Sequence, residues 1–296
     1  DILSLNGTRE GLYNAAMALC PEAKAGQSPL VLLPNPFYQV YLAATFSVAA
    51  QPHLVTAQAA NGFLPDYARL SPDVLNRTAI AYICSPSNPQ GAVASPAYLK
   101  SLIELAETHD FKIFADECYS EIYRKGAPSG ALQIANQIGA DPERVVVFHS
   151  LSKRSNLPGL RSGFAASGPQ TIARMKHLRA YSGAPLPLPL QRVAEAVWAD
   201  EQHVIENRGL YQEKFGIADA LFGSVPGYIS PEAGFFLWLP VEDGEQAALK
   251  LWRETGIRVL PGAYLARDTP DGNPGHGFIR VALVAPKSIT EQALTR

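Results

Sequence analysis

The sequence has few cysteines, no long hydrophobic run and almost no net charge, and each of these absences excludes a class of protein. Cys20, Cys84 and Cys118 are an odd set without C-x-x-C spacing, so we predict neither a disulfide framework nor a metal site and expect a reduced, cytoplasmic protein. No apolar stretch approaches the roughly 20 residues of a membrane-spanning helix. Lys and Arg number 25 against 27 Asp and Glu, a net charge of −2, which favours neither nucleic acid nor a membrane surface as a partner.

The first residues also lack an initiator methionine and a secretion signal. DILSLNGTRE does not have the charged-then-apolar order of a signal peptide and opens instead on the strand-like run ILSL. We therefore expect an N-terminal portion before residue 1. The 296 residues, of which 47% are hydrophobic and 18% charged, are typical of a globular chain. At roughly 150 residues per domain, this length predicts two domains or one large one.

Short apolar runs alternate with longer amphipathic stretches over the first 180 residues, which is the pattern of βα units around a mainly parallel sheet. The predicted strands are 29–33, 79–84, 112–115, 145–149 and 163–166. The predicted helices are 10–19, 38–49, 96–108 and 169–181. The sequence therefore predicts the α/β class.

A proline-rich segment, SGAPLPLPLQ at 182–191, predicts a loop or an extended crossover, because proline denies a helix its N–H bonds. We place a domain boundary there, with a large α/β domain at 1–182 and a small α+β domain at 183–296. The second part has a long helical stretch from 190 to 208 that continues toward 222, and then the strand-like GFFLWLPV. A helix near 245–255 and the strand-like IRVLPG and GFIRVALV complete it.

Chemically unusual sequences follow three predicted strands, where ligands bind in open α/β sheets. AIAYIC runs into SPSNPQGAV, KIFA into DECYSEIY, and VVVFH into SLSKRSNLPGLRSGF. Lys153, in the third, is either a solvated loop lysine or a desolvated amine available for imine chemistry. Arg161 lies eight residues further among small residues, where it is either a bidentate phosphate ligand or a salt-bridge partner.

The other two strand ends carry an acid and an amide. Asp116 follows KIFA and either caps a helix or holds a cationic ring nitrogen. Tyr119, three positions on, would then reach a ring oxygen. Asn88, in Ser-Asn-Pro-Gln-Gly, is either an ordinary turn residue or an amide donor to that same oxygen.

Three further candidates lie elsewhere in the chain. Thr8 and Arg9 open a helix after Gly7, so their backbone N–H groups can bind a phosphate, although one such helix start is a weak signal. Tyr38 is either a core residue or a platform that stacks on a ring. Arg280 lies on an otherwise apolar strand and needs an anion, either an internal carboxylate or that of a substrate.

Together these residues specify one ligand, an aromatic ring with a cationic nitrogen, a hydroxyl, an aldehyde and a phosphate, which is pyridoxal 5′-phosphate (PLP). The order N-P-x-G, D-E-x-Y, S-x-S-K with Arg eight residues later, and a late Arg on a strand resembles the fold-type I, class I/II aminotransferases over residues 7–284. The resemblance implies a mainly parallel seven-stranded sheet flanked by helices. It also implies transfer of an amino group between an amino acid and a 2-oxo acid, by a homodimer with shared active sites.

Residue by residue, the resemblance implies catalytic roles for Lys153, which bonds to PLP as an imine, Asp116, which pairs with the ring nitrogen, and Tyr119. Substrate binding falls to Arg280, which holds the α-carboxylate, and to Asn88. The implied cofactor-binding residues are Thr8, Arg9, Tyr38, Asn88, Asp116, Tyr119, Ser150, Lys153 and Arg161, with Ser150 and Arg161 at the phosphate.

The runs NGTREGL, LPNPFYQVY, SPSNPQGAV and SLSKRSNLPGLRSGF resemble bacterial succinyldiaminopimelate aminotransferases of lysine biosynthesis. This implies N-succinyl-diaminopimelate with glutamate and 2-oxoglutarate as substrates. Family members carry an N-terminal arm that covers the active site and a residue that reaches the neighbouring subunit's phosphate, and neither is found here. Two alternatives stay open: a PLP-dependent carbon–sulfur or β-lyase of the same fold, and a PLP-binding transcription regulator with an N-terminal DNA-binding domain.

Overall fold

The computed structural model describes residues 1–296, which form two sheets. The larger sheet has seven strands in the order β1-β7-β6-β5-β4-β2-β3, and only β7 runs antiparallel to its neighbours. Its strands are β1 (Ile2–Leu5), β2 (Leu30–Asn35), β3 (Gln51–Thr56), β4 (Thr78–Cys84), β5 (Lys112–Asp116), β6 (Val145–Ser150) and β7 (Gly163–Ala166). The predicted α/β class and the mainly parallel seven-stranded sheet are confirmed.

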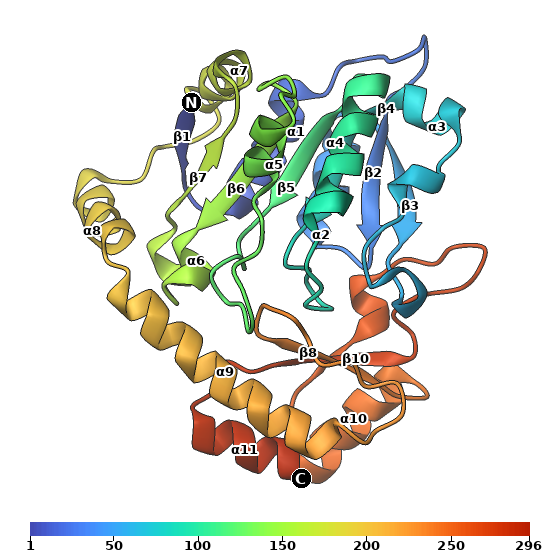
Figure 1. The fold of residues 1–296 in the computed structure, drawn as a ribbon, viewed down its shortest axis with the longest axis vertical. Coiled ribbons are helices and arrows are strands. Elements are labelled where there is room, and N and C mark those ends of the chain that lie inside the picture. The colour runs from blue at the N-terminus through green and yellow to red at the C-terminus, as the bar shows by residue number, and fades with distance from the viewer.

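Helices cover both faces of this sheet. One face packs on α1 (Thr8–Leu19), α2 (Gln39–Ser47) and α7 (Pro169–Arg179). The other packs on α3 (Pro72–Arg77), α4 (Pro96–His109) and α5 (Ala131–Gln137), and Figure 1 shows α4 and α5 in front of the sheet with α1 behind it. Because both faces are covered, the central strands β2 and β4 are buried along their whole length and read as continuous apolar runs.

The second sheet has three antiparallel strands in the order β8-β10-β9. They are β8 (Phe236–Pro240), β9 (Leu260–Pro261) and β10 (Phe278–Ala282), accompanied by α9 (Gln202–Phe222), α10 (Gly244–Thr255) and α11 (Lys287–Thr295). Figure 1 shows this sheet below the larger one, with α9 running along both parts. The strands of the large sheet lie within residues 2–166 and those of the small sheet within 236–282; the boundary between 182 and 183 stays a prediction.

Two sequence predictions around the proline-rich segment are wrong. Residues 182–191 are not all loop, because α8 (Leu188–Ala199) begins inside them with Pro189 in its first turn, where a helix N–H needs no partner. The expected continuous helix from 190 toward 222 is interrupted at Asp200 and Glu201. Asp200 Oδ1 accepts a hydrogen bond from Gln202 N, the first residue of α9, at 2.9 Å across this interruption.

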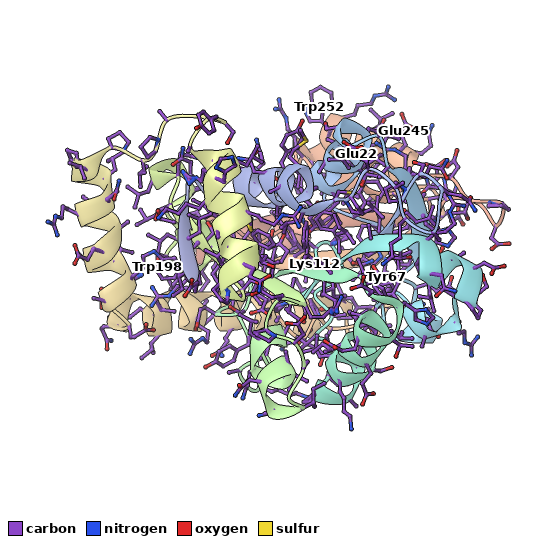
Figure 2. All side chains as sticks on the ribbon, turned by 90° about the horizontal axis from the view of Figure 1, so that it is seen from above. Glu22, Tyr67, Lys112, Trp198, Glu245 and Trp252 are labelled. Atoms are coloured by element: carbon purple, nitrogen blue, oxygen red, sulfur yellow. The ribbon has the colours of Figure 1, made fainter.

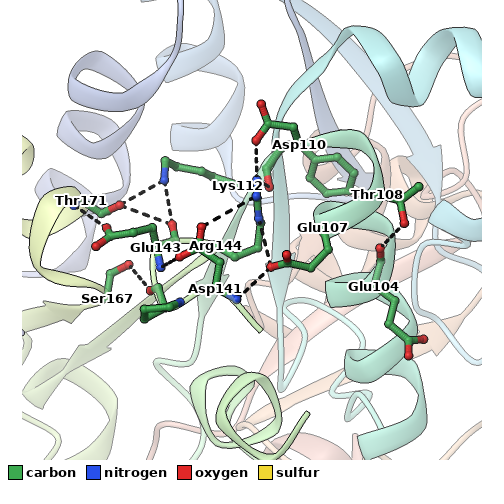
Figure 3. Close-up of polar contacts among 12 residues, drawn as sticks. Glu104, Glu107, Thr108, Asp110, Lys112, Asp141, Glu143, Arg144, Ser167 and Thr171 are labelled. Atoms are coloured by element: carbon green, nitrogen blue, oxygen red, sulfur yellow. Dashed lines mark hydrogen bonds and ion pairs between the residues drawn. The ribbon is translucent and has the colours of Figure 1, made fainter. Parts of the chain in front are cut away.

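Charged residues hold together the edge of the large sheet at which β5 and β6 begin (Figure 3). Arg144, 12% exposed, pairs with Glu107 at 3.3 Å and with Asp110 at 2.8 Å. Lys112 Nζ donates to the Glu143 carbonyl at 2.7 Å and so ties β5 to the start of β6. Pairs this close to solvent contribute about 0–1 kcal/mol each. They stabilise the edge opposite to the one at which β5 and β6 end.

Side chains fill the space between the sheets and their helices, while Trp252 on α10 points outward (Figure 2). No helix has both the length and the apolar character needed to cross a membrane.

Candidate active site

The ends of β4, β5 and β6 lie side by side because the three strands are parallel neighbours. The antiparallel β7 starts at this same edge, which places Arg161, two residues before it, beside the end of β6. The short helix α6 (Leu151–Arg154) follows β6 directly and carries Lys153. The topology thus gathers side chains from distant positions at one edge of the sheet.

A cavity of about 400 Å³ opens at this edge. Nine of the ten predicted site residues line it: Thr8, Arg9, Tyr38, Asn88, Asp116, Tyr119, Lys153, Arg161 and Arg280. Four of these are Arg or Lys, and Asp116 is the one acidic residue among the lining side chains. The excess of cations suits a ligand or substrate with several negative charges.

Ser150 is the predicted site residue that does not line the cavity. It is 2% exposed, and its hydroxyl donates to Ser152 Oγ at 2.8 Å and accepts from Ser152 N at 3.1 Å. Ser150 therefore caps the N-terminus of α6. Ser152, which the sequence analysis did not single out, reaches the cavity. The place of Ser150 in the phosphate site stays a prediction.

Lys153 has an amine without a partner inside the chain. Its Nζ forms no hydrogen bond or ion pair and lies 5.1 Å from the centre of the Phe235 ring. Burial lowers the pKa of Lys153, because it penalises the charged ammonium. Lys153 is thus a desolvated amine, which is the state that nucleophilic chemistry requires.

Asp116 is a buried carboxylate, 4% exposed, at the last position of β5. The Tyr41 hydroxyl donates to its Oδ2 at 2.8 Å, and Cys118 N donates to its Oδ1 at 3.3 Å. No Lys or Arg pairs with it, and burial raises the pKa of Asp116 despite the two hydrogen bonds. No helix starts at Asp116, so the capping role considered above does not apply and the carboxylate lacks a cationic partner.

Arg280 and Asn88 meet across the two sheets. Arg280 Nη1 donates to Asn88 Oδ1 at 2.9 Å, and the guanidinium carbon lies 4.3 Å from the centre of the Phe236 ring. No carboxylate pairs with Arg280, so the internal ion pair considered above is absent. Because Asn88 uses its oxygen for Arg280, its amide N–H groups remain to donate to a ligand.

The Tyr119 hydroxyl has no hydrogen-bond partner within the chain although the residue is buried. Burial is the largest cause that raises the pKa of Tyr119. The phenol therefore keeps its proton and is available to donate it in a hydrogen bond to a ligand oxygen.

The start of α1 and Arg161 form the second end of the cavity. Gly7 caps α1 with φ 84° and no side-chain cap, and a Cβ there would clash with the Arg161 guanidinium. Arg161 Nη1 donates to the Pro158 carbonyl at 2.9 Å and Nη2 to the Asn6 carbonyl at 3.2 Å. Free helix N–H groups beside a guanidinium form an anion site.

Further aromatic and sulfur-bearing residues line the cavity or lie behind it, and the sequence analysis did not name them. Phe236 and Cys118 line the cavity, and Tyr41 lies behind Asp116. Cys118 stands between the predicted residues Asp116 and Tyr119 in the D-E-x-Y run, and this position could have identified it as a site residue. Phe236 lies in the small sheet, and only the three-dimensional fold brings it to Arg280.

A desolvated lysine near a buried carboxylate and two arginines, at the carboxyl edge of an α/β sheet, defines an enzyme that reacts with amines or carbonyl compounds. The family model described as aminotransferase class I and II matches residues 1–295. The chain belongs to this family and is an aminotransferase, an enzyme that acts on amino acids and 2-oxo acids; the family is generally PLP-dependent. The predicted family and its fold are thereby confirmed.

Relatives and solved structures agree with this assignment. The LL-diaminopimelate aminotransferase of Dehalococcoides mccartyi is 30% identical over 304 residues, which cover 100% of this chain and 74% of that protein. The crystal structure of an aminotransferase from Neisseria meningitidis superposes with a TM-score of 0.93 at 41% identity, covering 99% of this chain and 75% of that one. A probable N-succinyldiaminopimelate aminotransferase from Thermus thermophilus gives 0.87 at 27% identity, covering 100% and 76%.

Proposed function

We propose that this aminotransferase uses PLP bound to Lys153 and exchanges an amino group between N-succinyl-diaminopimelate and the glutamate/2-oxoglutarate pair, a step of lysine biosynthesis. The observation that carries the proposal is a set of ionisable groups without an oppositely charged partner in the chain: the buried Asp116 carboxylate and the half-buried Lys153 amine and Arg280 guanidinium. Each is costly to bury alone, and all three line one cavity.

The residues present fit PLP group by group. Asp116 matches the protonated ring nitrogen, and the Asn88 amide with the Tyr119 hydroxyl matches the ring oxygen. The start of α1 with Arg161 matches the phosphate, and Lys153 matches the aldehyde. When bound, PLP supplies a carbonyl carbon that bonds to amines and a ring that accepts electrons.

The chain's own residues then bind the substrate and move a proton. Arg280 holds the α-carboxylate with two parallel N–H bonds, and its contact with Asn88 fixes the plane of the guanidinium. Lys153 Nζ would take the proton from the substrate Cα as a base and, as an ammonium, would give it up at the carbon that was the aldehyde carbon of PLP. Tyr38 lines the cavity. Arg9 Nε donates a hydrogen bond to the Tyr38 hydroxyl at 2.7 Å and so holds the Tyr38 ring in place.

The choice of the succinylated substrate rests on one solved structure, the probable N-succinyldiaminopimelate aminotransferase of Thermus thermophilus, and on the surplus of positive charge in the cavity. Arg161 serves the phosphate and Arg280 the α-carboxylate, which leaves the exposed Arg9 guanidinium at the entrance, in contact with both the cavity and an open groove beside it. N-succinyl-diaminopimelate and 2-oxoglutarate each carry a further carboxylate, besides the one held by Arg280, for Arg9 to pair with.

A panel of amino donors tests this function. With PLP and 2-oxoglutarate present, N-succinyl-LL-diaminopimelate should be converted faster than unmodified LL-diaminopimelate, aspartate or alanine, with glutamate as the product. A preference for another donor would replace the substrate and keep the amino transfer. Release of ammonia and pyruvate from cysteine or cystathionine would instead support the lyase alternative.

The Arg280→Lys variant should lose about 10- to 100-fold in kcat/KM for every donor, because an ammonium loses one of two charged hydrogen bonds worth about 1.5–3 kcal/mol each. PLP affinity and Tm should stay near wild type. Arg258→Lys is the matched control, because Arg258 also lies over an aromatic ring, that of Trp252, but does not line the cavity. A lowered Tm with unchanged activity per folded molecule would refute the role of Arg280.

A homodimer with shared active sites is also part of the proposal. Apolar side chains stand uncovered around α8, with Tyr181 82% and Leu188 74% exposed, and we assign this surface, together with the loop before α8, to the second copy. Sedimentation velocity of the active enzyme measures the state directly, and an active monomer would contradict it.

A further inference from the structure

Tyr41 is buried directly behind the cavity. It lies on α2, is 0% exposed, and donates its hydroxyl hydrogen bond to Asp116 Oδ2 at 2.8 Å. Its ring stacks on Tyr82 at 4.4 Å between centroids and meets Tyr38 edge-on at 5.8 Å. Packing on two rings leaves Tyr41 no room to change rotamer, so the position of its hydroxyl is fixed.

The bond to Asp116 is chemically distinctive among the buried tyrosines. Tyr67 and Tyr82 satisfy their hydroxyls on backbone carbonyls, those of Tyr82 and Leu12. Tyr41 instead bonds to the one carboxylate of the cavity. A buried carboxylate depends on donors of this kind to stay ionised. Cys118 N supplies the other donor, to Oδ1 at 3.3 Å, a longer bond.

We propose that Tyr41 is a positioning residue that orients the Asp116 carboxylate toward the cofactor ring nitrogen and keeps it ionised. This rests on the proposed function, in which Asp116 holds that nitrogen. One helix then supplies both groups for the ring: Tyr38 at its N-terminus covers the ring, and Tyr41, one turn later, acts through Asp116.

The groups around Asp116 determine whether loss of the Tyr41 hydroxyl raises or lowers the pKa of Asp116. Burial raises the pKa of Asp116, and the hydrogen bonds from Cys118 and Tyr41 oppose this rise. The titratable groups that face it come from five segments and are Tyr41, Cys84, Cys118, Tyr119, His149 and Lys153. Loss of the Tyr41 hydroxyl removes one opposing donor, so the carboxyl group should protonate at a higher pH.

Tyr41→Phe tests the proposal, with Tyr82→Phe as the matched control, since both residues are fully buried and each variant loses one hydroxyl hydrogen bond. We expect Tyr41→Phe to lower kcat about tenfold, the effect of one hydrogen bond to a charged group. The acid limb of its kcat–pH profile should move to higher pH. The pH at which the absorbance of bound PLP changes should move in the same direction. Tyr82→Phe should move neither the acid limb of the kcat–pH profile nor the pH of the absorbance change.

A double-mutant cycle with Asp116→Asn separates this proposal from the one on which it rests. If Tyr41 acts through Asp116, adding Tyr41→Phe to Asp116→Asn should change kcat and the PLP spectrum no further. Full additivity would overturn the positioning role. A Tyr41→Phe variant whose pH profile and spectrum match those of Tyr82→Phe would overturn it as well. Normal turnover in Asp116→Asn alone would instead refute the proposed function at Asp116.

Discussion

Replacing Lys153 with alanine should lower kcat by about 10⁴-fold, the upper range for loss of a general acid–base group, while PLP still binds. The amine has no other partner in the chain, so its removal leaves no buried acceptor unsatisfied and the fold should be retained. The proposed phosphate site lies elsewhere, at Arg161 and the start of α1. The measurement is a single-turnover assay of the PLP-loaded variant, with PLP affinity determined separately.

Borohydride trapping locates the reactive lysine independently of turnover. Peptide mapping of the reduced wild-type protein should find the pyridoxyl group on Lys153. Lys214 is an internal control, because burial lowers its pKa as well but its Nζ donates to the Leu283 carbonyl at 2.9 Å. Label on Lys214 or on any other lysine would overturn the assignment of Lys153.

Most of the residues named from the sequence line one cavity, because most of them follow strand ends. Asn88, Asp116 and Lys153 each come within a few residues of an apolar run, and parallel pairing brings the ends of such runs together. Tyr41 and Phe236 were not predicted, because nothing local distinguishes them from core residues. Their roles depend on contacts with Asp116 and Arg280, which lie 75 and 44 residues away in the chain.

The missed elements have physical reasons of their own. β3 is an edge strand whose Gln51 is exposed and whose next residue is a proline, so it shows no apolar alternation. The helices α3 and α5 have six and seven residues, fewer than two full turns, so no period can be recognised in them. None of the three contributes a residue to the lining of the cavity, and the prediction of the site did not depend on them.

Ser150 and Ser152 show where a motif stops being informative. Both belong to the S-x-S-K run, and the sequence analysis named Ser150, at the phosphate, and not Ser152. Ser150 is the last residue of β6, so its hydroxyl caps the short helix, and Ser152, in the first turn of that helix, lines the cavity. Only the direction of α6 relative to the sheet separates the two roles.

Asp116→Asn should lower kcat by about 10²- to 10³-fold, the usual cost of removing one preorganised electrostatic partner, and without loss of stability. Burial raises the pKa of Asp116 in the folded chain, so the native state binds this proton more tightly than the unfolded state does. The stability of the PLP-free protein therefore rises as pH falls through that pKa. At neutral pH the ionised carboxylate lowers the free energy of unfolding. Asparagine removes the charge, so the PLP-free variant should have a Tm equal to or above that of the wild type at pH 7.

A structural aspartate should behave in the opposite way, and Asp243 provides the comparison. Its Oδ1 caps α10 by accepting from Glu245 N at 2.9 Å and Gln246 N at 3.0 Å, and these bonds lower its pKa. Asp243→Ala should lower the Tm at pH 7, because two helix N–H groups lose their acceptor, with unchanged kcat per folded molecule. Thermal melts of the PLP-free proteins and kcat of the PLP-loaded ones separate the two roles. An Asp116→Asn variant with a lowered Tm and near-normal turnover would make Asp116 a structural residue like Asp243.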